Sequence, residues 1–106
     1  MLELIESLEG SDKGFARISV SFAGTSEPIH VTSQFAYISA AIHPASGTAR
    51  IEFTLSALAS VVDNTAKWIP WNIGDVSSSE ADSFVSVVTA VRGIASTTAV
   101  LEICAR

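Results

Sequence analysis

Apolar and polar residues alternate along several short stretches of the chain. The clearest alternation runs from Phe15 to Phe22, where every second residue after Ala16 is apolar and the residues between are polar. Thr48–Leu55 alternates in the same way. Because successive side chains of a β-strand point to opposite faces, this period of two predicts strands with one buried face.

Other apolar stretches extend this pattern. Ile29–Ile42 is a longer β run whose inward parity changes near Gln34–Tyr37, which indicates a bulge or a bend between two strands. Ser56–Val62 also fits helical spacing, but the strand-like residues before it favour a strand. Phe84–Ala90 and Ala99–Ile103 flank a connection rich in Gly, Ser and Thr, and are predicted to form a β-hairpin.

Turn signals separate these stretches at intervals of about ten residues, and no stretch has the pattern of a long helix. This arrangement predicts an all-β fold of seven or eight strands, an antiparallel β-sandwich of the jelly-roll or immunoglobulin-like kind. A chain of 106 residues is expected to form one domain, residues 1–106. Residues 1–14 are either a short first strand or an extended N-terminal arm.

The surface is expected to be poor in charge. Charged residues make up 16% of the chain, against a usual level of about 25%, while 16 Ser and 8 Thr supply small hydroxyl groups. Monomers normally cover their surface with Lys and Glu, so the composition predicts contacts between subunits in a homo-oligomer. The six Lys and Arg are scattered and the net charge is −5, which argues against binding to nucleic acid or to an anionic membrane. No signal peptide or transmembrane stretch is evident, so a soluble protein made in the cytoplasm is expected.

The aromatic cluster Trp68-Ile-Pro-Trp71 is the first candidate site. Trp68 and Trp71, with Asn72 beside them, could stack on a sugar ring and bind its hydroxyl groups. Large aromatic rings are more often part of a core or an interface. Pro70 has no amide hydrogen for a central ladder and predicts an edge strand or a bulge.

An acidic loop is the second candidate. Asp75, Glu80 and Asp82 could converge on a calcium ion, but the spacing lacks the pattern of a calcium helix-loop-helix, and a solvated loop is the default expectation. His30 and His43 have no companions at the spacing of a zinc site and are read as ordinary polar residues.

No catalytic constellation is found. The chain has no serine elbow and no glycine-rich phosphate loop, so no enzyme activity and no cofactor are expected. Cys104 is the one cysteine and is read as a small hydrophobic residue.

Two ion pairs are expected on the surface. Arg50 and Glu52 lie on the outward face of one predicted strand and would form an exposed pair of small weight. Arg92 could pair with Glu102 across the predicted hairpin.

The last forty residues or so resemble small structural proteins of tailed bacteriophages. The resemblance rests on Trp68-Ile-Pro-Trp71, Gly74-Asp-Val, Val88-Thr-Ala-Val-Arg92 and Ala99-Val-Leu-Glu-Ile103. It implies a virion β-sandwich, such as a head decoration protein or a small tail module, that works as a symmetric oligomer without a cofactor. Phage capsid or tail proteins would be its partners, and a trimer is favoured.

In this interpretation the contacts would come from aromatic side chains: Trp68, Trp71, Tyr37 and Phe84. The alternative is a carbohydrate-binding β-sandwich that uses Trp68, Trp71 and Asn72.

Overall fold

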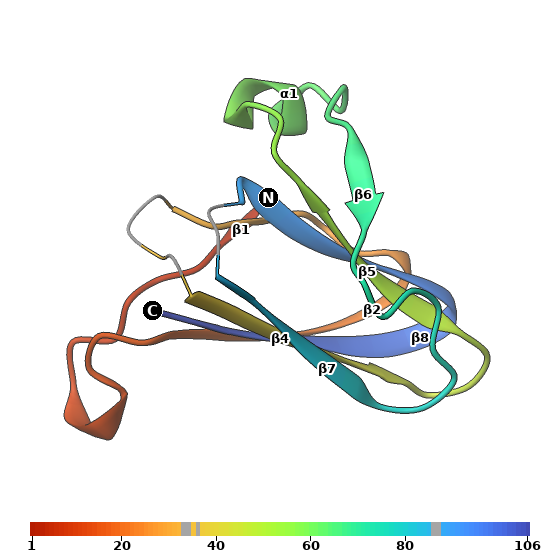
Figure 1. Ribbon diagram of the computed structural model, residues 1–106, viewed down its shortest axis with the longest axis horizontal. Coiled ribbons are helices and arrows are strands. Elements are labelled where there is room, and N and C mark those ends of the chain that lie inside the picture. Colours follow the sequence, from red (N-terminus) through yellow and green to blue (C-terminus); the bar gives the residue numbers. More distant parts are fainter. Residues whose placement is uncertain (33–34, 36, 86–87) are drawn as a thin grey trace.

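One long strand, β8 (Ala90–Ala105), organises the fold. A computed structural model describes residues 1–32, 35, 37–85 and 88–106, and within them β8 runs for 16 residues and curves back on itself (Figure 1). Four strands pair antiparallel with it. β2 (Ala16–Thr25) and β3 (Ile29–His30) follow one edge, while β4 (Tyr37–Pro44) and β5 (Ala49–Thr54) follow the other.

Three shorter strands complete the sheet at its margins. β7 (Glu80–Val85) pairs with β4, and β6 (Trp68–Pro70) pairs with β5. β1 (Leu2–Glu3) pairs parallel with β3, so the sheet is mixed. The described residues thus form eight strands, and the predicted all-β, sandwich-like fold is confirmed.

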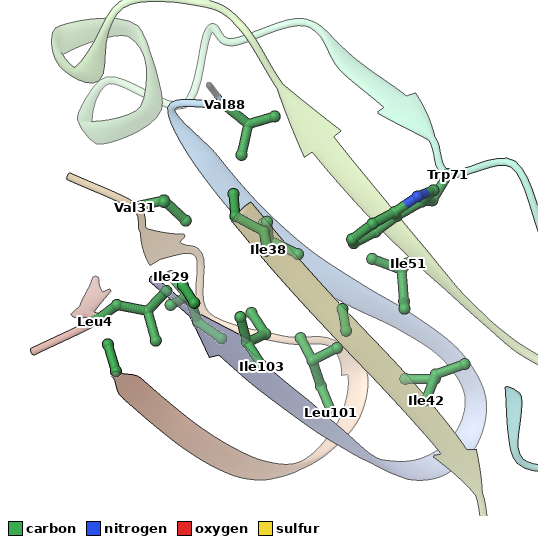
Figure 2. Packing of buried hydrophobic residues seen from close by; sticks show 14 of the residues in the cluster. Leu4, Ile29, Val31, Ile38, Ile42, Ile51, Trp71, Val88, Leu101 and Ile103 are labelled. Atoms are coloured by element: carbon green, nitrogen blue, oxygen red, sulfur yellow. The ribbon is translucent and has the colours of Figure 1, made fainter. Parts of the chain in front are cut away.

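The core lies between the two halves of the curved sheet. Figure 2 shows Ile38 and Ile42 of β4, Ile51 of β5, and Leu101 and Ile103 of β8 converging there. All five are at most 2% exposed. Burial of each such side chain contributes about 1.5–3 kcal/mol, so this cluster is the main source of stability.

The N-terminal residues belong to the folded body. Leu2 and Glu3 pair with β3, and the side chain of Leu4 is 2% exposed within the core. Within residues 1–14, the strand is limited to Leu2–Glu3. The turn after it contains the short 3-10 helix η1 (Gly10–Asp12).

The run Ile29–Ile42 forms two strands, β3 and β4, as the change of parity suggested. The change itself was placed at Gln34–Tyr37, and Gln34 and Ala36 lie outside the described residues.

The predicted C-terminal hairpin is wrong. The connection between Arg92 and Thr98 is the middle of β8, and β4 lies between β8 and β7. Gly93 is placed here for close packing, because a Cβ atom at this position would collide with the ring of Phe22. Gly93 does not have the positive φ angle that a tight turn often requires, and β8 continues through it.

The predicted strand at Ser56–Val62 is also wrong, since the chain forms helix α1 (Leu58–Val62) there. β5 ends at Thr54, whose hydroxyl donates to the Lys67 carbonyl at 2.7 Å and accepts from the Ser56 amide at 3.1 Å. These bonds hold Thr54 close to Lys67, so the segment between the two residues leaves the sheet. The backbone hydrogen bonds of α1 within this segment are local. Within the part of the chain that is described, no helix has the length and apolar character needed to span a membrane.

Candidate functional site

Small side chains cover the outward side of β2, β8, β4 and β7. The inward residues of β2, β8 and β4 lie in the core or pack against it, and the alternate residues form rows across the four strands. We call this surface the outer face and define it by two complete rows and a partial one: Arg17, Cys104, Ser39 and Ser83; Ser19, Glu102, Ala41 and Ala81; Ser21, Val100 and His43.

A shallow groove of about 340 Å³ runs across the two complete rows. Its lining includes Ser19, Ser39 and Ala41, with Arg17 and Glu102 as its charged groups. The groove is open to solvent along its length, so it offers a broad, low surface more than an enclosed pocket.

His43 links three separate segments at the end of the outer face. Its Nδ1 lies 2.8 Å from the Ser79 hydroxyl, and its Nε2 lies 2.5 Å from the Glu102 carboxylate. The His43 and Glu102 side chains are 37% and 56% exposed. This group could not be recognised from the sequence, because Ser79 and Glu102 are 36 and 59 residues from His43.

This order of serine, imidazole and carboxylate is also used by hydrolases. In those sites the groups are shielded from water, which strengthens their electrostatic interactions. Here all three groups lie at the surface, so the arrangement works as a clamp that fastens the loop before β7 to β4 and β8.

A second polar group surrounds Glu52, whose side chain is only 7% exposed. Arg50 donates from Nε to one carboxylate oxygen at 2.9 Å, and Arg92 donates to the other from Nε at 2.9 Å and Nη2 at 2.7 Å. The Arg92 guanidinium also lies 4.3 Å from the centroid of the Trp68 ring. The hydrogen bond to Glu52 raises the pKa of Arg50 above its ordinary value.

Both predicted ion pairs therefore need correction. Glu52 is buried and shared between two guanidinium groups, where an exposed pair was expected. Arg92 binds Glu52 and not Glu102, because the predicted hairpin does not exist and Arg92 lies opposite Glu52 in the register of β5 and β8.

The predicted carbohydrate platform is wrong. The Trp71 side chain is 1% exposed and lies in the core, as Figure 2 shows, so it can neither stack on a sugar nor contact another subunit. Trp68 is half-buried under Arg92, while Asn72 is exposed. Pro70 does mark an edge strand, since β6 pairs with β5 alone among the described residues.

The remaining predicted contact residues have different outcomes. Tyr37 is 53% exposed at the border of the outer face, so its role in a contact stays a prediction. The side chain of Phe84 lies outside the described part of the structure.

The three acidic residues proposed for calcium are not brought together. Asp75 lies 3.4 Å from Arg50, while Glu80 and Asp82 are paired with Ile42 and Ala40 along β7. Among the described side chains, no group of three or more His, Cys, Asp and Glu residues is placed to hold a metal ion. The calcium hypothesis therefore has no support in the structure.

Comparison with known proteins gives a fold and no family. No family model matches the chain, and neither does any curated protein. Among solved structures, oxalate oxidase superposes with a TM-score of 0.52 at 16% identity, covering 87% of this chain and 41% of its own. The match agrees with the all-β, sandwich-like fold of the chain. At this identity the match shows the fold alone, and this chain spans about two fifths of the oxalate oxidase chain.

Two other solved structures have lower scores. A cupin-2 domain protein from Shewanella frigidimarina matches with a TM-score of 0.42 at 12% identity, covering 85% of this chain and 68% of its own. Hydroquinone 1,2-dioxygenase from Sphingomonas sp. TTNP3 matches with a TM-score of 0.42 at 11% identity, covering 86% and 58%. None of the three is a phage structural protein, and the prediction of a bacteriophage virion protein is wrong.

Proposed function

We propose that this chain is a non-enzymatic module that associates with a second copy of itself through the outer face. The observation that carries the proposal is the composition of the two complete rows. Six of their eight positions are Ser, Ala or Cys, and the charges are one cation, Arg17, and one anion, Glu102. A strand face meant only for water usually carries several Lys and Glu side chains.

The shape of the outer face suits a flat partner. Small side chains let two sheets approach to their usual separation of about 10 Å, and the open groove gives them room to interlock. A face that packs against itself does so about a two-fold axis. We therefore propose two-fold contacts in place of the trimer expected from the sequence.

Charge complementarity supports a second copy as the partner. Arg17 lies opposite Cys104 in the register, and Ser19 lies opposite Glu102, so the cation and the anion are diagonal neighbours. A two-fold axis that passes between them places the Arg17 of each copy over the Glu102 of the other. Unlike charges that meet in this way favour this orientation over others.

The absence of activity is part of the proposal. Apolar side chains fill the space between the halves of the sheet. An active site in a sandwich would need a pocket shielded from solvent, and this space is occupied. The one group with the order of a hydrolase site, Ser79 with His43 and Glu102, is exposed to water.

The test is the molar mass measured by light scattering during size-exclusion chromatography. Ala41→Arg places a long cation in the middle of the outer face, while Ala59→Arg makes the same change on the exposed surface of α1. An unpaired charge in an interface costs about 2–5 kcal/mol, so Ala41→Arg should weaken association by about 30-fold or more. Ala59→Arg should leave the mass unchanged. If Ala41→Arg has the mass of wild type at every concentration, the outer face is not the contact.

A charge exchange tests the orientation of the two copies. Arg17→Glu and Glu102→Arg should each weaken association, because each places like charges opposite one another across the axis. The double variant restores the unlike pairs and should recover the wild-type dissociation constant. Losses that simply add in the double variant would exclude this two-fold arrangement.

A further inference from the structure

Four strands have a single neighbour among the described residues, and three of them carry features that discourage pairing with another chain. β1 has two residues, and β6 has three and ends in Pro70. β7 carries Glu80 and Asp82 in the rows that face the core side of the sheet. Short length, proline and inward-pointing charge are the usual protections of an exposed sheet edge.

β2 has none of these protections along most of its length. It runs for ten residues, contains no Pro, Lys, Asp or Glu, and pairs with β8 alone among the described residues. The N-terminal segment covers only its start, where Glu6 bridges Ala16 and the Ser7 amide donates to the Phe15 carbonyl at 2.8 Å. A bulge between Ala23 and Thr25 marks its far end.

The hydrogen-bond pattern identifies the backbone groups on the open edge of β2. Arg106 and Tyr37 exchange two backbone hydrogen bonds of 3.0 Å, so the amide and carbonyl of Arg106 point toward β4. Backbone groups of successive residues in a strand point to opposite sides, so Cys104 and Glu102 also bond to β4, while Ala105, Ile103 and Leu101 bond to β2. Counting along the register, Ala16, Ile18, Val20 and Phe22 bond to β8. The amide and carbonyl groups of Ser19, Ser21 and Ala23 therefore point away from the sheet.

We propose that β2 pairs antiparallel with β2 of a second copy and joins the two sheets into one. An axis at Ser21 places Ser19 opposite the partner's Ala23, and Ser21 opposite the partner's Ser21. Each of these pairs can exchange two hydrogen bonds, which satisfies all the open groups of this stretch on both copies. The small side chains at these positions leave room for the approach.

The neighbouring positions are also self-complementary. The same register places Val20 opposite the partner's Phe22, and both side chains are half-buried against the core of their own copy. Pairing of an aromatic with a β-branched residue stabilises adjacent antiparallel strands. This edge contact uses a different surface from the outer face, so either can exist without the other.

Amide hydrogen exchange measured by NMR tests the pairing directly. The Ala81 amide is the internal reference, because by the same count it points away from the opposite edge of the sheet, on β7. The amides of Ser19, Ser21 and Ala23 should exchange at least about tenfold more slowly than that of Ala81 in concentrated protein, and lose this protection on dilution. Exchange at the rate of Ala81 at all concentrations would overturn the proposal.

A pair of Ser21 variants gives a second measurement. Ser21→Pro removes the donor at the axis, and Ser21→Ala is the matched control, because it keeps the backbone amide and a small side chain. Ser21→Pro should weaken association by about tenfold or more, while Ser21→Ala should not. If Ser21→Pro does not fold, the exchange experiment on the wild-type chain still decides. Ala41→Arg separates the two surfaces, because it should leave the protection of Ser21 intact.

Discussion

Glu52 is the one buried charged side chain among the described residues, and its contacts show how one residue can join separate strands of this fold. Its two carboxylate oxygens accept from Arg50 and Arg92, which belong to the neighbouring strands β5 and β8. Arg92 in turn lies over the Trp68 ring on β6. One carboxylate therefore connects β5 with β8, and through Arg92 the connection extends to β6.

Replacing Glu52 by Gln should destabilise the protein measurably. Loss of one partner from a buried ion pair costs about 3–5 kcal/mol, and the partial exposure of Arg50 and Arg92 (34% and 21%) reduces this to about 1–3 kcal/mol. Urea unfolding gives the free energy. Glu9→Gln is the matched control, because Glu9 is exposed, and it should change the free energy by no more than about 0.5 kcal/mol. Equal losses in the two variants would show that Glu52 has no special role.

The pH dependence of this difference follows from the Arg50 pKa. A raised pKa in the folded state means that the stabilisation is complete below the ordinary arginine pKa and is lost only as the pH rises past it. The difference in unfolding free energy between wild type and Glu52→Gln should therefore stay constant between about pH 7 and pH 10. A steady decline across this range in urea titrations would contradict the assignment.

At the scale of the element, β8 depends on a contact that no local pattern reveals. Gly93 lies beneath the ring of Phe22, and the space for a Cβ atom is taken by that ring. A strand interior normally disfavours glycine, so a close approach by another side chain accounts for it. The sequence alone suggests that Gly93 belongs to a turn, because the contact with Phe22 joins positions far apart in the chain and leaves no local pattern.

Gly93→Ala should therefore destabilise the protein by about 1–3 kcal/mol, since the Phe22 ring must move away from the strand. Phe22→Leu removes the obstacle at some cost of its own. In the double variant the loss should be smaller than the sum of the two single losses, as measured by a double-mutant cycle in urea. Additive losses would show that the two residues do not interact.

The comparison of β2 with β8 shows how far the sequence could lead at this scale. The alternation in Phe15–Phe22 predicted a strand with the correct inward face, because period and burial are local properties. The hairpin at β8 failed because strand pairing depends on distant partners. The burial of Glu52 and the group around His43 were missed for the same reason, since each joins residues that lie on different strands.

For the whole molecule, the low content of charged residues predicts association between copies, which stays a prediction. The structure shows where small uncharged side chains gather: on one face of β2, β8, β4 and β7 and along one edge of β2. The resemblance of the C-terminal forty residues was misleading, because its motifs describe strand-forming sequence and not a particular chemistry.

The two proposed contacts make a joint prediction about assembly. The two-fold axis of the β2 edge runs perpendicular to the sheet, and that of the outer face runs parallel to it. If the axes intersect, four copies close into a tetramer, and if they do not, the contacts repeat and form an open chain. In both cases the wild-type assembly should contain at least four copies at high concentration.

Each single variant disrupts one of the two contacts. Ala41→Arg and Ser21→Pro should therefore both form dimers and nothing larger, whichever way the wild type assembles. The combined variant should be a monomer, and light scattering on the four proteins at equal concentration gives all the masses. A monomer from Ala41→Arg alone would mean that the edge does not pair independently, and a monomer from Ser21→Pro alone would mean the same of the outer face. The pattern of masses therefore decides between two separate surfaces and one continuous surface that both substitutions disturb.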